Sequence, residues 1–196
     1  MSDGPYKSLK MRKAWRDVAE RAHKDAFSLE ERADGMCVAL HDDFKRDVGK
    51  SALNAIANVL IETEQGNLFA DQAGAELEAI RNSQRSTGFF DSIIEHIQVA
   101  THQGFTGEPA LIEGLNRAGI DQARGNIRAV EEHYHRDTPN AEGAEKAASV
   151  RANLDATLQT DRVRAFGAEV IQLMRGESVS TKLEKDSDLD AGPVVA

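Results

Sequence analysis

The amino-acid sequence predicts an all-α protein, a compact bundle of five to seven helices with no significant β-sheet. Three observations lead to this fold class. Apolar residues recur at steps of three and four along most of the chain, which is the period of one helix face. Residues 6–108 contain no proline, and no stretch shows the sustained alternation of apolar and polar residues that marks a half-buried strand. At 196 residues, the chain can bury a core without disulfides or metals.

Composition sets the predicted limits of the domain. We expect a flexible N-terminus at residues 1–7 and a single helical domain over residues 8–175. From residue 176 onward the chain is polar and acidic, and its few apolar residues have no helical continuity. Residues 176–196 are therefore predicted to form a disordered acidic tail.

The first half of the chain is predicted to form three or four helices. Ser28 and Glu31 have the spacing of a capping box, in which each side chain bonds the other residue's backbone amide, so a second helix starts there and ends near Gly49. Gly66 interrupts the third helix, and the pattern resumes in a new helix or beyond a kink. The predicted inward positions are Met11, Trp15, Val18, Ala22 and Ala26; Ala33, Met36 or Cys37, Leu40, Phe44 and Val48; Leu53, Ile56, Ala57, Leu60 and Ile61; and Phe69, Ala73, Leu77 and Ile80.

The second half follows a polar loop expected at residues 82–87. Thr106 is a plausible N-cap for a long helix that ends near Arg136, and Pro109 is tolerated in its first turn. A phase slip of the apolar pattern beside Thr160 predicts a bend or a new helix. The inward positions are Phe89, Phe90, Ile93, Ile94, Ile97 and Ala100; Leu111, Leu115, Ala118, Ile127, Val130 and Tyr134; Val150, Leu154 and Leu158; and Val163, Phe166, Val170 and Leu173.

Charge and cysteine content exclude several classes of function. The chain carries 24 Lys and Arg against 33 Asp and Glu, a formal net charge of −9, which makes it a poor general binder of polyanions. Its single cysteine excludes an intramolecular disulfide framework and a cysteine-based zinc cluster. No apolar run has the length of a secretory signal or a membrane span, so we expect no membrane association and a cytoplasmic location.

The run from Met36 to Asp43 contains the first candidate site, the adjacent pair His41 and Asp42. This run resembles the metal-binding segment of HD-type phosphohydrolases, which place such a pair after an apolar helical stretch. The resemblance implies further ligands, for which the chain offers His23, His96, His102 or Asp161. The neighbours of His23 do not match the family's upstream motif, and metal binding needs several convergent ligands. An amphipathic helix whose exposed side begins at His41 explains the same residues.

Glu132 and His135 form a second candidate, a Glu-x-x-His pair on one helix face. Di-iron helical bundles use two such pairs and two further carboxylates. A solvated helix end explains the pair equally well, because a histidine near a helix C-terminus is favoured by the helix dipole. We therefore predict no metal and no other cofactor.

A basic N-terminal segment and a small-residue stripe are the candidate interaction surfaces. Basic residues near an aromatic ring can bind nucleic acid, but Trp15 lies on the apolar face, so we expect a protein partner instead. Glycine costs about 1 kcal/mol against alanine within a helix, so the glycines around residues 110–125 predict close approach of another helix, either internal or from a second subunit in a homodimer. The predicted interaction residues are Lys10, Arg12, Lys13, Arg16, Gly114 and Ala118.

No catalytic motif is complete. The segment from Gly49 to Ser51 lacks the upstream glycine and the strand of a phosphate-binding loop, and the chain has no Gly-x-Ser-x-Gly elbow. The sequence therefore predicts a non-catalytic helical protein that binds another protein, as an accessory or regulatory subunit of a bacterial or mobile-element system. The alternative is a metal-dependent HD-type phosphohydrolase centred on His41 and Asp42.

Overall fold

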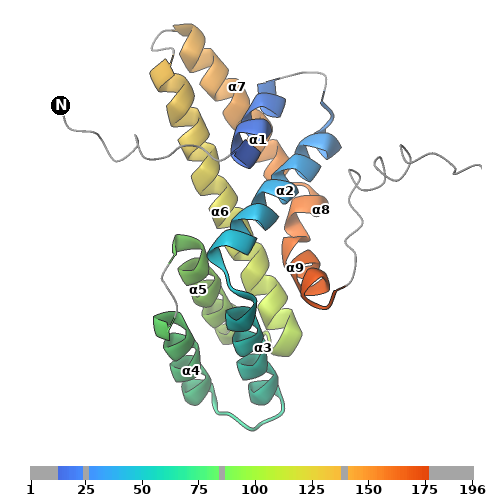
Figure 1. Cartoon of the computed structure of the whole chain (residues 1–196), viewed down its shortest axis with the longest axis vertical. Helices are drawn as coiled ribbons and strands as arrows, with labels where there is room; N and C mark the ends of the chain where they lie inside the picture. The colour runs from blue at the N-terminus through green and yellow to red at the C-terminus, as the bar shows by residue number, and fades with distance from the viewer. Residues whose placement is uncertain (1–12, 24–26, 84–86, 138–140, 177–196) are drawn as a thin grey trace, which may run out of the picture. The chain divides into compact units, whose positions relative to one another are not determined.

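The computed structural model describes residues 13–23, 27–83, 87–137 and 141–176, with the backbone alone at residues 23, 133–135 and 137. Within these residues the fold is all-α, as predicted, and contains no strand (Figure 1). Nine helices lie in the described part, more than the five to seven predicted, because the breaks near Gly66 and Thr160 each start a new helix. They are α1 (Lys13–His23), α2 (Leu29–Asp47), α3 (Lys50–Glu64), α4 (Ala70–Ser83), α5 (Gly88–His102), α6 (Gly107–Asp137), α7 (Ala141–Leu158), α8 (Asp161–Arg164) and α9 (Phe166–Met174).

The helices are distributed over two compact units. Unit 1 takes its described residues from Met1–Ala39 and Ala123–Val163, and unit 2 from Leu40–Gln122 and Arg164–Ala196. Helices α2 and α6 therefore supply residues to both units. The flexible N-terminus predicted at residues 1–7 and all but the first residue of the predicted tail lie outside the described residues.

The single domain predicted over residues 8–175 stays a prediction, and two spectroscopic probes can test it. Trp15 is the only tryptophan of the chain and lies in unit 1, so its fluorescence reports that unit, whereas circular dichroism reports the helices of both units. Because α2 and α6 are shared, we expect both signals to follow one transition with the same urea midpoint. Two separated midpoints would instead show that the units unfold independently.

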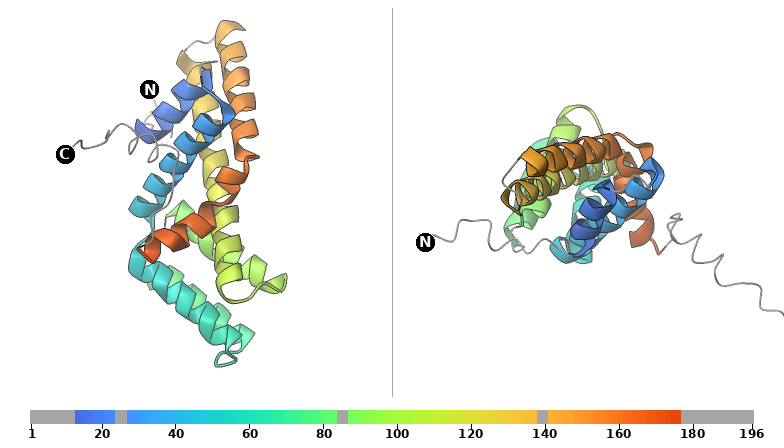
Figure 2. Two further views of the ribbon diagram at one scale, coloured as in Figure 1. Left: turned by 90° about the vertical axis from the view of Figure 1, so that its right-hand side faces the viewer. Right: turned by 90° about the horizontal axis from the view of Figure 1, so that it is seen from above.

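Unit 1 is built on the packing of α1 against α7, which run beside each other with the second part of α6 (Figure 2). Trp15 is only 1% exposed, which confirms its predicted place in the core. The side-chain amide of Asn153 donates to the carbonyl oxygen of Ala22 at 2.7 Å and ties α7 to the end of α1. The remaining core of this unit includes Val18, Ala33, Met36, Cys37, Ile127, Val130, Val150, Leu154 and Leu158.

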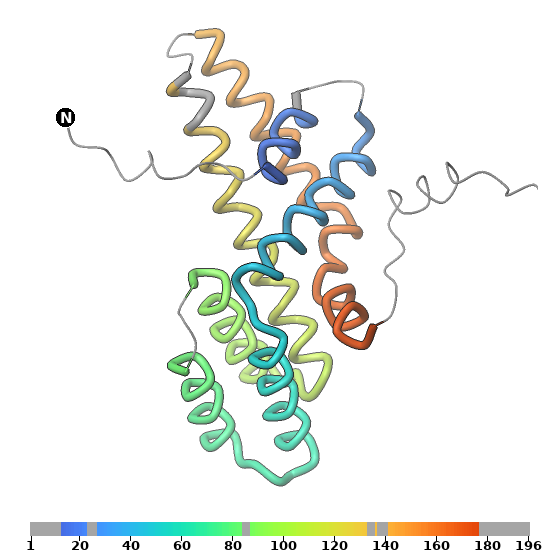
Figure 3. Tube along the Cα trace, in the orientation of Figure 1, coloured from blue at the N-terminus to red at the C-terminus, as the bar shows by residue number. Residues whose placement is uncertain are grey.

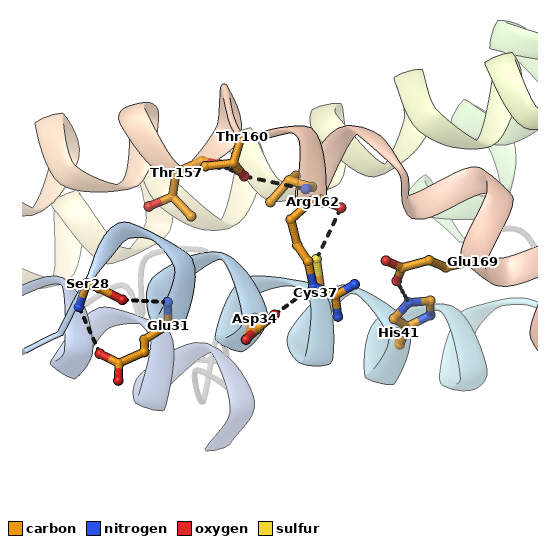
Figure 4. Close-up of polar contacts among 10 residues, drawn as sticks. Ser28, Glu31, Asp34, Cys37, His41, Thr157, Thr160, Arg162 and Glu169 are labelled. Atoms are coloured by element: carbon orange, nitrogen blue, oxygen red, sulfur yellow. Dashed lines mark hydrogen bonds and ion pairs between the residues drawn. The ribbon is translucent and has the colours of Figure 1, made fainter. Parts of the chain in front are cut away.

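Polar contacts fix both ends of the part of α2 that belongs to unit 1 (Figure 4). The predicted capping box is present: the amide of Glu31 donates to Ser28 Oγ at 3.2 Å, and the amide of Ser28 donates to Glu31 Oε2 at 2.8 Å. Further along, Arg162 Nε donates to the buried Asp34 at 2.6 Å. Cys37 is buried and its thiol approaches the carbonyl oxygen of Arg162 at 3.6 Å, so it packs as a small apolar residue.

Unit 2 contains a row of helices in which α4 packs against both α3 and α5 (Figures 1 and 3). The predicted inward residues of α5 are all buried, which confirms that this helix belongs to the core. Thr87 caps α5, because its Oγ1 accepts the amide of Phe90 at 3.1 Å. Phe166 of α9 joins this core, with its ring centroid 6.3 Å from those of Phe44 and Phe89.

Glycines allow three close approaches inside unit 2. A Cβ at Gly114 would lie 2.3 Å from Ile97 Cγ1, and one at Gly119 would lie 2.6 Å from the Phe166 ring. A Cβ at Gly167 would lie 2.4 Å from the carbonyl oxygen of Ile112. Helix α6 therefore approaches α5 and α9 more closely than alanine would allow. The helix predicted to pack closely on the small-residue stripe thus lies within the same chain.

Three predicted inward positions are wrong, because Phe69, Ile61 and Leu173 are exposed. Phe69 is 75% exposed, because it precedes the first residue of α4 and its amide donates to the Gln72 side chain, so it does not lie on the helix face. Ile61 is 42% exposed, because it lies one residue beyond Leu60, at the edge of the buried face of α3. The loop predicted at residues 82–87 also begins too early in the prediction, because α4 continues to Ser83.

Candidate functional site

His41 and Asp42 do not converge on one site. His41 lies in unit 2 and points to α9, where its Nε2 is 2.8 Å from Glu169 Oε2 (Figure 4). Its ring also lies 5.0 Å from that of Phe166. Asp42 is the next residue of the helix and is exposed, because successive helical side chains are about 100° apart. Of the two residues, Asp42 is therefore the exposed one, whereas the sequence suggested that the exposed side begins at His41.

Two of the other ligands implied by the HD-type resemblance bind other groups. His96 binds Asp121 at 2.5 Å, and the ring of His102 contacts the backbone oxygen of Gln98 at 2.7 Å. Asp161 belongs to unit 1, and the side chain of His23 is outside the described set. Among the described residues, no three His, Cys, Asp or Glu side chains are placed to hold a metal ion. This part of the structure therefore gives the phosphohydrolase hypothesis no support.

The Glu132 and His135 pair receives no structural support either. Glu132 is exposed on α6, and the side chain of His135 is not among those described. The preceding carboxylate has a clear role instead, because Glu131 binds Arg151 of α7 within unit 1.

The predicted interaction residues have different environments. Lys13 and Arg16 are exposed on α1, whereas Lys10 and Arg12 lie outside the described residues. Because Trp15 is buried, it is not available to stack on a base beside these cations. Gly114 and Ala118 are buried inside unit 2 by the packing described above, so they do not present a surface to a second chain.

A groove in unit 2 is the feature best suited to binding. It is a hollow of about 270 Å³ bounded by α2, α3 and α9. It lies where the apolar faces of these helices meet, at the end of α2 and the start of α3. Its lining residues are His41, Phe44, Lys45 and Val48 from α2 and its end, Lys50 and Leu53 from α3, and Val170, Leu173 and Met174 from α9. We call this surface the α9 groove.

The α9 groove has an apolar lining and a basic rim. Leu53 and Val170 are buried beneath it, whereas Leu173 is 41% exposed at its edge. Lys45 and Lys50 are exposed and form no ion pair with any described residue. Glu169 is buried and is bonded to His41. The groove can therefore cover apolar side chains and pair with carboxylates.

Sequence reasoning missed Glu169 as the partner of His41 and Leu173 as part of this groove. Glu169 follows Phe166 by three positions and precedes Val170, so a carboxylate on the apolar stripe was a visible signal that it needs an internal partner. Leu173 was predicted to face inward, but it lies in the last turn of α9 at the edge of unit 2.

None of the described helices has the length and apolar character needed to cross a membrane. No protein-family model, curated protein or solved structure matches the chain.

Proposed function

We propose that this chain is a non-catalytic helical protein that binds another protein, as an accessory or regulatory subunit, and that the α9 groove is its binding surface. The observation that carries the proposal is the combination, in one hollow, of an apolar lining with two lysines that have no described ion-pair partner. Leu173 is exposed at the edge of this lining, and an exposed apolar patch with a polar rim is typical of an interaction site.

The chemistry of the groove defines the partner. A helix with apolar residues at steps of three and four can place them on Leu53, Val170 and Leu173. Acidic residues flanking that stripe would meet Lys45 and Lys50, which also speeds association at low salt. We therefore propose as occupant an amphipathic helical segment of another protein, with carboxylates beside its apolar face.

A displayed library of 20-residue helical peptides tests this proposal, with the full chain as bait. We expect enrichment of peptides that combine an apolar stripe with acidic flanks, because these satisfy both the lining and the rim. The affinity of one enriched peptide is then measured by fluorescence anisotropy against wild type and Leu173→Glu. The substitution is expected to weaken binding at least about tenfold, since it places a carboxylate at the edge of the apolar lining.

Ile61→Glu is the matched control. Ile61 is 42% exposed and Leu173 is 41% exposed, both in unit 2, but only Leu173 lines the groove. Binding by Ile61→Glu should equal that of wild type. The proposal is wrong if no peptide is enriched, or if the enriched peptides bind Leu173→Glu as tightly as wild type.

A further inference from the structure

A second hollow, within unit 1, lies between the second part of α6 and α7. Its volume is about 320 Å³, and none of its lining residues belongs to the α9 groove. Three arginines line it: Arg124 and Arg128, which are one turn apart on α6, and Arg151 on the facing side of α7. The buried side chains of Ile127 and Leu158 complete an apolar base. We call this feature the arginine hollow.

The positive charge of the arginine hollow is only partly balanced by its neighbours. Arg151 donates from Nε to Asp155 at 3.1 Å and from Nη1 to Glu131, and these bonds, that to Glu131 first, raise the pKa of its guanidinium. Its Nη2 keeps two N–H donors that no described residue accepts. Arg128 forms no hydrogen bond or ion pair with any described residue. Asp155 is the carboxylate that lines the hollow with these three guanidinium groups, Glu131 also bonds Arg151, and Arg124 is engaged in an interaction of its own.

This arrangement is unusual in a chain of net charge −9, because like charges gather here although carboxylates outnumber cations overall. Guanidinium groups hydrogen-bond phosphate oxygens in a planar, two-point geometry. The carboxylates that bind Arg151 also hold its plane in place, which reduces the entropy lost when a ligand binds.

We infer that the arginine hollow binds a small phosphorylated molecule. Its phosphate group lies between Arg128 and Arg151 and within the field of Arg124, and an adjacent apolar portion covers Ile127 and Leu158. This site is independent of the α9 groove, so a phosphorylated ligand adds a second binding activity to the proposed interaction function.

Isothermal titration calorimetry of the full chain with phenyl phosphate, inorganic phosphate and benzoate tests this inference at low salt. Phenyl phosphate is expected to bind with a dissociation constant at or below about 1 mM. Inorganic phosphate should bind more weakly because it leaves the apolar base uncovered. Benzoate should also bind more weakly than phenyl phosphate, because its carboxylate offers one fewer terminal oxygen and less charge. Arg128→Gln should weaken phenyl phosphate binding about tenfold or more.

Arg16→Gln is the control, because Arg16 is an exposed arginine of unit 1 that does not line the hollow. This substitution removes the same charge as Arg128→Gln, and the variant should bind phenyl phosphate as tightly as wild type does. Circular dichroism should show both variants folded, since Arg128 has no bond to lose. The inference is overturned if phenyl phosphate does not bind at 1 mM, if benzoate binds as tightly, or if both variants lose affinity equally. It is also overturned if a duplex oligonucleotide binds through Arg128 while phenyl phosphate does not.

Discussion

Phe166→Ala is expected to lower the free energy of unfolding by about 3–5 kcal/mol, the range for truncating a large aromatic side chain in a core. Phe166 is fully buried in unit 2 and its ring packs with those of His41, Phe44 and Phe89. The loss of this ring leaves a cavity between α6 and α9. It also removes aromatic contacts that stabilise the fold beyond the effect of the buried area. Urea denaturation followed by circular dichroism measures the change.

Phe69→Ala provides the comparison within the same unit. Phe69 is 75% exposed, so the same chemical change should alter the free energy of unfolding by no more than about 0.5 kcal/mol. Similar losses in the two variants would contradict the packing of α9 that places Phe166 in the core.

Gly114→Ala and Gly125→Ala are expected to change stability in opposite directions, although both lie on α6. The new Cβ at Gly114 would lie 2.3 Å from Ile97 Cγ1 and 3.0 Å from the Ile97 backbone, so α5 must move. Overpacking of this kind costs about 1–3 kcal/mol, which exceeds the gain of about 1 kcal/mol in helix propensity. At Gly125 nothing lies within 4 Å, so only the propensity gain of about 0.5–1 kcal/mol remains.

Thermal and urea unfolding of the two variants measure these changes. Sedimentation of the wild type shows whether the protein is a monomer or a dimer. A monomer that loses stability with Gly114→Ala places the close contact inside one chain. Stabilisation by Gly114→Ala, or a loss that depends on protein concentration because it follows dimer dissociation, would contradict the internal packing of α6 on α5.

Most of the helical pattern could be predicted because its causes are local. The capping box of Ser28 and Glu31 depends on residues three positions apart, and the apolar stripe of α5 is visible in fifteen consecutive residues. The breaks were also recognisable, although a kink could not be told from a new helix. Gly66 has φ of 81°, a left-handed conformation that favours glycine, and this ends α3 fully.

Neither binding feature could be predicted from the sequence, because each depends on contacts between distant segments. His41 and Glu169 are 128 residues apart, so the sequence could indicate only that each needs a partner. Arg124 and Arg128 have the spacing of a solvated helix face, and only the pairing of α6 with α7 brings Arg151 opposite them. Local periodicity identifies which residues are buried, but it does not identify which helices pack together.

The most direct test of the central claim is a methyl NMR titration of the full chain with an enriched amphipathic peptide. If the α9 groove is the binding surface, the methyl resonances of Val48, Leu53, Val170, Leu173 and Met174 should show the largest shifts, because these side chains line it. The methyl groups of Ile127 and Leu158 in unit 1 should not change. Shifts centred on unit 1, or on Val99 and Ile61 of unit 2, would show that the peptide binds elsewhere and would contradict the proposal.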